Sequence, residues 1–212
     1  MRDLTYYPGC TLTTTARNLD ASAREAMERL DVFLAELPRW NCCGTVASLS
    51  SDDLMDHLGP IRLLTRTQEL GSSEVVTLCT MCFNTMKMSN HLVQNDPERL
   101  EKINKFMDRE EDYRGEVKVL HLLEVLRDQI GFEEVKKRVV NQLKGLKLVS
   151  YYGCLLTRPK EVAIDDVEAP TVLDDLLSSL GAETPYEPYS RVQRSTKGLA
   201  LYGSYPKVRT SY

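Results

Sequence analysis

The chain has 212 residues and a formal net charge of −4, and 42% of its residues are hydrophobic and 27% charged. This composition suits a globular protein of one domain or two small ones, and a chain of this length can bury a core without disulfide bonds. Acidic and basic residues are mixed along the chain, which argues against a nucleic-acid-binding surface. No signal-peptide pattern is present, and no apolar run approaches the roughly 18 residues of a membrane span. We therefore expect a cytoplasmic protein with reduced thiols.

The first part of the chain is expected to form a strand, a helix and a loop. A short strand pattern over Leu4–Tyr7 is followed by Pro-Gly, which places Cys10 in a loop just past the strand. The threonines that come next can cap a helix over Ala16–Val32, where apolar residues recur at helical spacing. No helical period is visible over Leu37–Ser51, so this segment, which contains Cys42–Cys43, is expected to be a loop.

The middle of the chain alternates helices with a strand. Its first helix pattern contains Pro60, where we expect a break or a kink. The expected elements are a helix over Asp52–Leu70, a strand over Glu74–Leu78, a helix over Thr80–Leu92 and a helix from Asn95-Asp96-Pro97 to about Asp108.

The last elements continue the alternation of strands and helices. They are a strand over Val117–His121, helices near Leu122–Ile130 and Phe132–Leu143, and a strand over Leu146–Tyr151. This order predicts an α/β fold with a short, mainly parallel sheet flanked by helices. Ligands bind outside the carboxyl ends of the strands in sheets of this kind.

One short phrase occurs twice in the chain. Tyr6–Thr13 and Tyr151–Thr157 share the pattern Tyr-Tyr-(Pro)-Gly-Cys, with Leu and Thr close behind it. The repeat predicts two pseudo-repeated domains. The first would cover residues 1–146 and the second, incomplete one residues 147–212.

Five of the six cysteines form three groups. Thirty-one residues separate Cys10 from Cys42–Cys43, and thirty-five separate that pair from Cys79, which forms a Cys-x-x-Cys with Cys82. Cys10, Cys79 and Cys82 follow expected strands, so the topology alone places these three at one edge of the sheet. The Cys42–Cys43 loop must then reach the same edge.

Four kinds of chemistry can use such thiols. Inert core packing explains a lone cysteine, but adjacent cysteines beside a glycine pack poorly. A thioredoxin-like dithiol at a helix N-terminus would use Cys79 and Cys82 only. Structural zinc would take four of the five thiolates, in an order unusual for zinc knuckles. An iron–sulfur cluster, held by Cys thiolates that often include a Cys-x-x-Cys, accommodates the set best.

The remaining chemistry-bearing residues give weaker signals. The three histidines, His57, His91 and His121, lie in helix or strand patterns without an acidic partner at ligand spacing. We expect them to be surface or core residues. No Ser-His-Asp order, phosphate-binding loop or Gly-x-Gly-x-x-Gly motif is visible.

The pattern Cys-x31-Cys-Cys-Gly-x34-Cys-x-x-Cys resembles the cysteine-rich CCG domain. The sequence around Tyr6–Thr13 and Tyr151–Pro159 is most similar to the B subunit of heterodisulfide reductase, and the resemblance spans about residues 4–190. It implies two tandem CCG domains, each of which binds a noncubane [4Fe-4S] cluster through five cysteines. The ligands of the first cluster, and through it the catalytic site, would be Cys10, Cys42, Cys43, Cys79 and Cys82.

The same resemblance implies a function and partners. The B subunit reduces the mixed disulfide of coenzyme M and coenzyme B in methanogenesis, with the substrate held between the two clusters. Electrons arrive through an iron–sulfur C subunit from a flavin-bearing A subunit. Two alternatives stay open. One is an iron–sulfur electron-transfer protein within a 2-hydroxyacid or glycerol-3-phosphate oxidoreductase, and the other is a zinc-stabilised binding module.

The second half of the chain departs from the family pattern. Cys154 matches the first ligand of the second motif, but residues 186–195, where Cys-Cys-Gly is due, hold no cysteine. The last Cys-x-x-Cys is missing too. We interpret this as a truncation or frame shift from about residue 193, and we expect Cys154 to lie outside the first site.

Overall fold

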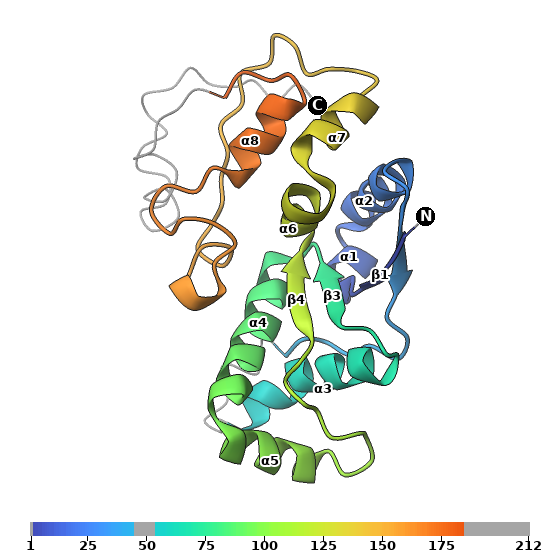
Figure 1. Cartoon of the computed structure of the whole chain (residues 1–212), viewed down its shortest axis with the longest axis vertical. Coiled ribbons are helices and arrows are strands. Elements are labelled where there is room, and N and C mark those ends of the chain that lie inside the picture. The colour runs from blue at the N-terminus through green and yellow to red at the C-terminus, as the bar shows by residue number, and fades with distance from the viewer. Residues whose placement is uncertain (1, 45–53, 185–212) are drawn as a thin grey trace.

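The computed structural model describes residues 2–44 and 54–184 of the chain, and Figure 1 shows its arrangement. Its centre is a four-stranded sheet in the order β2-β1-β3-β4, in which every neighbouring pair is parallel. The strands are β1 (Arg2–Tyr6), β2 (Val32–Glu36), β3 (Glu74–Thr77) and β4 (Lys118–His121). The expected α/β class with a parallel sheet is confirmed.

Two apolar cores cover the two faces of this sheet. Leu4 and Tyr6 of β1 share one core with Val76 of β3, against helix α2 and the segment that follows β4. The neighbouring residue Val75 points to the other face and joins the larger core under helices α3, α4 and α5. Because successive side chains of a strand point to opposite faces, the short strand β3 serves both cores.

The helices lie on either side of the sheet, and no described helix is long and apolar enough to cross a membrane. The α-helices are α1 (Gly9–Thr13), α2 (Arg17–Arg29), α3 (Met55–Glu69), α4 (Thr80–Asn95), α5 (Pro97–Phe106), α6 (Leu122–Glu124), α7 (Phe132–Arg138) and α8 (Val172–Ser179). A π-helix covers Val125–Ile130 and a 3₁₀-helix covers Lys160–Val162.

The region before the first cysteine pair differs from the sequence-based expectation in three ways. Helix α2 ends at Arg29, and Val32–Glu36 forms β2, which pairs along its full length with β1. The helical spacing of the residues before Val32 gave no sign of this edge strand. Its extended conformation depends on pairing with β1, which the pattern of a single segment does not show. No threonine caps α2, since its N-cap is Ala16. Cys10 lies in the short helix α1 and not in a loop.

Pro60 does not break helix α3. It lies in the second turn, where its missing N–H removes one intrahelical hydrogen bond, yet the helix continues to Glu69. Pro60 is buried, as are Leu58 and Ile61 on either side. The apolar contacts of this turn therefore offset the lost bond. The start of the helix expected at Asp52 lies outside the described residues.

The strand expected over Leu146–Tyr151 is wrong. In this segment the described residues contain only an isolated bridge between Lys147 and Glu183, with hydrogen bonds from Leu148 N and to Leu146 O. A strand pattern without a partner strand cannot form a ladder, so no regular strand develops here. The pseudo-repeat of whole domains is therefore not confirmed.

The repeated phrase nevertheless has the same local geometry in both places. Gly9 and Gly153 have φ values of +71° and +68°. In each copy the threonine four residues later hydrogen-bonds to the glycine carbonyl, from Thr13 at 3.2 Å and from Thr157 at 3.4 Å. The phrase thus specifies a turn. Whether a strand precedes it depends on the rest of the fold, because β1 precedes the first copy and no regular strand precedes the second among the described residues.

The segment after residue 146 packs on the first part of the chain. Tyr152, Leu156, Ile164 and Val172 belong to the same apolar core as Phe83 of α4. The division into domains at residues 1–146 and 147–212 stays a prediction. Residues 186–195 and the C-terminal stretch lie outside the described residues.

Candidate functional site

The three cysteine groups meet at the carboxyl edge of the sheet. Cys10 lies in α1, directly after β1, and Cys79 is the N-cap of α4, directly after β3. Cys82 lies in the first turn of α4. Because β1 and β3 are parallel neighbours, their ends open at the same place.

The Cys42–Cys43 loop follows β2, on the other side of β1, and rests on helix α3. A Cβ atom at Gly59 of α3 would lie 3.3 Å from the Cys42 carbonyl oxygen and 3.4 Å from that of Cys43. The missing side chain of this glycine lets the loop approach α3 this closely. The packing of this loop on α3 brings the adjacent cysteines to the edge.

The five thiols form a connected set. The Cys42 thiol interacts with those of Cys10 and Cys43, and the Cys82 thiol interacts with those of Cys43 and Cys79. Cys43 and Cys82 are each 3% exposed, whereas Cys10 and Cys42 are exposed. The set therefore extends from the core to the surface, and the structure brings together all five cysteines that the sequence grouped.

Mutual proximity changes the acidity of these thiols. The Cys82 side chain donates to its neighbour and lowers the pKa of Cys79 to about 6. The hydrogen bonds with Cys43 and Cys79, together with burial, raise the pKa of Cys82. For Cys42 a hydrogen bond from the Gly44 backbone lowers the pKa, but burial and the Cys43 and Cys10 thiols outweigh it and raise the pKa overall. Five thiolates cannot coexist here without a positive partner.

The donors of this site are all thiols. Among the described residues, no three His, Cys, Asp or Glu side chains are placed to hold one ion. The thiols instead form a row of pairwise contacts, and two adjacent cysteines suit two neighbouring metal atoms. Thiolates are soft ligands that bind zinc and iron–sulfur clusters.

Tyr7 is a buried residue next to the thiol set. It is fully buried, its hydroxyl donates to the Asn41 carbonyl at 3.0 Å, and its ring packs edge-on against Trp40 at 5.7 Å between centroids. Burial, followed by the charges of the Cys82, Cys43 and Cys42 thiols, raises its pKa, so the phenol stays protonated. The sequence pattern placed Tyr7 at the end of a strand and in the repeated phrase, without a role at the thiol set.

His121 fixes the backbone just before Cys79. Its Nδ1 accepts from Leu123 N at 3.3 Å, so its Nε2 carries the proton and donates to the Leu78 carbonyl at 3.0 Å. Burial lowers its pKa to about 4. The histidine is therefore neutral and structural, and it is the core case of the expected surface or core histidine.

Cys154 lies on a separate loop held against α4. The Asn84 side chain donates to Leu155 O at 2.9 Å and to Arg158 O at 2.8 Å, which binds this loop to the helix that carries Cys82. Cys154 itself is half-buried. Among the described residues, β1 leads into the helix that contains Cys10, whereas no strand leads into the Cys154 loop.

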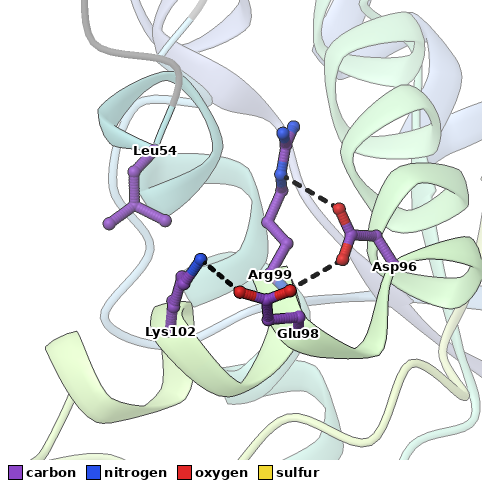
Figure 2. Close-up of a pocket in the computed structure, with 5 residues that line it drawn as sticks. All are labelled: Leu54, Asp96, Glu98, Arg99 and Lys102. Atoms are coloured by element: carbon purple, nitrogen blue, oxygen red, sulfur yellow. Dashed lines mark hydrogen bonds and ion pairs between the residues drawn. The ribbon is translucent and has the colours of Figure 1, made fainter.

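A hollow of about 270 Å³ lies at the other end of α4, where α5 begins (Figure 2). Its charged residues pair with one another: Arg99 with Asp96 at 3.4 Å and Lys102 with Glu98 at 2.8 Å. Asp96 also caps α5 through Arg99 N. These contacts explain the polar residues as helix-capping and surface ion pairs.

Comparison with known proteins agrees with the cysteine pattern. Residues 4–87 match the family model of the CCG cysteine-rich domain, and this range contains all five grouped cysteines. The recognition of a CCG domain is confirmed for this part of the chain.

Curated relatives extend the similarity over most of the chain. It is 27% identical to the B subunit of the ferredoxin/F420H2-dependent CoB-CoM heterodisulfide reductase of Methanosarcina acetivorans, over 87% of this chain and 62% of the relative. It is 28% identical to an Archaeoglobus profundus protein named for its likeness to the heterodisulfide reductase B subunit, over 84% and 61%. It is also 28% identical to the 8-methylmenaquinol:fumarate reductase membrane anchor subunit of Wolinella succinogenes, over 88% and 65%. The chain thus spans about three fifths of the length of these relatives.

A solved structure shares the fold. A hypothetical protein from Helicobacter pylori superposes with a TM-score of 0.65 over 88% of this chain and 33% of its own, at 10% identity. This likeness supports the arrangement of strands and helices and carries no functional argument.

Proposed function

We propose that the chain is an iron–sulfur subunit of a disulfide-reducing oxidoreductase complex of the heterodisulfide reductase type. One observation carries the proposal: five thiols from three separate segments form a connected set at the carboxyl edge of the sheet. The relatives named as subunits of oxidoreductases support a redox role at the level of the family. We propose the cytoplasm, where thiols stay reduced, as the compartment.

The five cysteines would hold a noncubane [4Fe-4S] cluster, which passes electrons one at a time. Cys43 and Cys82 would be its buried ligands, and Cys10 and Cys42 would lie toward the surface, where a substrate has access. Reduction of a disulfide takes two electrons and two protons and releases two thiols. We propose the CoM-S-S-CoB heterodisulfide or a related disulfide as the substrate, and an iron–sulfur C subunit and a flavin-bearing A subunit as partners.

A second candidate is an iron–sulfur electron-transfer protein whose complex does not act on a disulfide. The relative from Wolinella succinogenes favours it, because its name places a similar chain in a fumarate reductase. Oxidoreductases of 2-hydroxyacids or glycerol-3-phosphate belong to the same group. Turnover of a heterodisulfide with a chemical reductant, tested against fumarate, separates the two candidates.

Metal analysis of the protein tests the cofactor. Protein prepared without oxygen, or reconstituted with iron and sulfide, should contain both elements and show an EPR signal on redox titration. A zinc-stabilised module is the competing explanation for the same thiolates. Zinc without iron or sulfide, in protein that resists reconstitution, would defeat the redox function.

A further inference from the structure

A largely buried arginine on α3 holds the segment that carries the adjacent cysteines. Arg66 donates through Nη1 to the Arg39 carbonyl and to Asn41 Oδ1, the latter at 3.0 Å. Its Nη2 pairs with Glu110 at 3.0 Å, and the two side chains are only 17% and 15% exposed. Arg39 has a φ of +55°, in the left-handed region that few residues other than glycine adopt. The bond to its carbonyl stabilises that conformation.

Arg66 also decides how the Asn41 amide is oriented. Since guanidinium groups only donate hydrogen bonds, Asn41 must turn its oxygen toward Arg66. Its Nδ2 then points the other way and donates to Cys42 O at 2.8 Å and to Gly59 O at 3.2 Å. The Asn41 side chain thus joins Arg66 to the backbone between the two cysteines.

The Cys42 carbonyl belongs to the peptide that links Cys42 to Cys43. A peptide group is planar, so the direction of its C=O fixes the direction of the Cys43 N–H and restricts both Cα–Cβ bonds. The relay from Glu110 through Arg66 and Asn41 therefore fixes the orientation of the peptide that carries the two adjacent cysteines. Contacts behind metal ligands are known to orient them in this way.

We infer that Arg66 is the positioning residue that presets the Cys42–Cys43 peptide for cluster binding, with Asn41 as its relay. The inference rests on the proposed function, because it concerns the same thiols. Arg66 acts on them through Asn41. Lysine cannot replace its planar fork, which serves Glu110 on one side and Arg39 and Asn41 on the other.

Two variants test the relay and a third controls for stability. Arg66→Lys keeps the charge and loses the fork. Asn41→Asp keeps the contact to Arg66 and strengthens it by charge, but it turns a carboxylate oxygen toward the Cys42 and Gly59 carbonyls. Arg62→Lys is the control, because Arg62 binds the same Glu110 at 2.9 Å and has no hydrogen bond to Arg39 or Asn41 among the described residues.

The readouts are iron release to a chelator from the reconstituted full chain, its EPR spectrum, and the Cys43 amide resonance of the iron-free, ¹⁵N-labelled protein. Arg66→Lys and Asn41→Asp should release iron about tenfold faster than the unmodified chain, as expected for contacts behind the ligands. Both should change the EPR spectrum and shift the Cys43 resonance. Arg62→Lys should change the thermal unfolding temperature only.

The two possible failures are distinguishable. If both test variants keep the release rate, the spectrum and the Cys43 resonance, or if Arg62→Lys changes them equally, the inference is overturned and the proposed function stands. If the unmodified chain binds no iron, the proposed function fails. The Cys43 resonance in iron-free protein still decides whether Arg66 orients the peptide.

Discussion

Single side chains set how closely the three cysteine segments approach one another. Gly9 follows β1 with a φ of +71°, and a Cβ atom there would lie 3.0 Å from the Cys82 sulfur. A Cβ contact of this length is tighter than nine in ten in real proteins, so Cys82 would have to shift by a few tenths of an ångström. The glycine therefore meets two requirements at once, a backbone conformation and a contact with a thiol.

Comparing Gly9→Ala with a control glycine variant should separate the cost of the backbone conformation from the cost of the contact with Cys82. Ala in the left-handed region costs about 1 kcal/mol, and crowding of a packed core costs about 1–3 kcal/mol more. Gly71→Ala is the control, because Gly71 has the same φ of +71° with nothing within 4 Å of its Cβ position. Denaturant unfolding of the iron-free protein should show the larger loss for Gly9→Ala. Equal losses would mean that the contact with Cys82 is unimportant.

His121 should make stability depend on pH in a narrow range. Burial lowers its pKa from the ordinary 6.5 to about 4, so the unfolded chain binds a proton that the folded chain does not. The free energy of unfolding is then complete above pH 6.5 and should fall by about 3 kcal/mol between pH 6.5 and 4. His121→Asn should flatten the profile of the iron-free protein over this range. Parallel profiles for both proteins would contradict the assignment.

At this scale the sequence predicted the thiols but not what holds them. The cysteines stand out by residue type and spacing. Tyr7, Asn41 and Arg66 are ordinary residue types, and their roles depend on contacts between segments far apart in the chain, such as Arg66 with Asn41. Asn41 was the one detectable case, because it directly precedes the Cys-Cys pair.

At the scale of elements, long periodic segments were predicted well. The strands near Leu4 and Val75 and the helices after Cys79 and Pro97 formed within a few residues of the expected bounds. The two misses that concern strands have one cause in common. Whether an extended segment becomes a strand depends on a partner, which β2 finds in β1 and which Leu146–Tyr151 lacks among the described residues.

Asn84→Ala should loosen the loop that contains Cys154. The variant removes two hydrogen bonds to backbone carbonyls, at a cost of about 2 kcal/mol. Asn95→Ala, at the exposed end of the same helix, removes a bond to His91 O and should cost no more than about 0.5 kcal/mol. Chemical denaturation measures both, and limited proteolysis locates the loosened loop. The packing account fails if the two variants unfold alike.

At the scale of the whole molecule, a part that matches the CCG family model is followed by a part that lies outside this match. The family model covers residues 4–87, and the chain spans about three fifths of its curated relatives. The described residues after 146 pack in the same core as α4 through Tyr152, Leu156 and Ile164. All five thiols of the set at the carboxyl edge lie within the part that matches the CCG family model.

The most direct test is the iron and acid-labile sulfide content of anaerobically reconstituted variants, with their EPR spectra. Serine at Cys10, Cys42, Cys43, Cys79 or Cys82 should lower bound iron and alter the signal, because a hydroxyl lacks the softness and charge of a thiolate. Cys154→Ser is the matched control and should keep both nearly unchanged. If Cys154→Ser loses as much iron as Cys42→Ser, or if none of the five substitutions lowers it, the central claim that these five thiols form one site is contradicted.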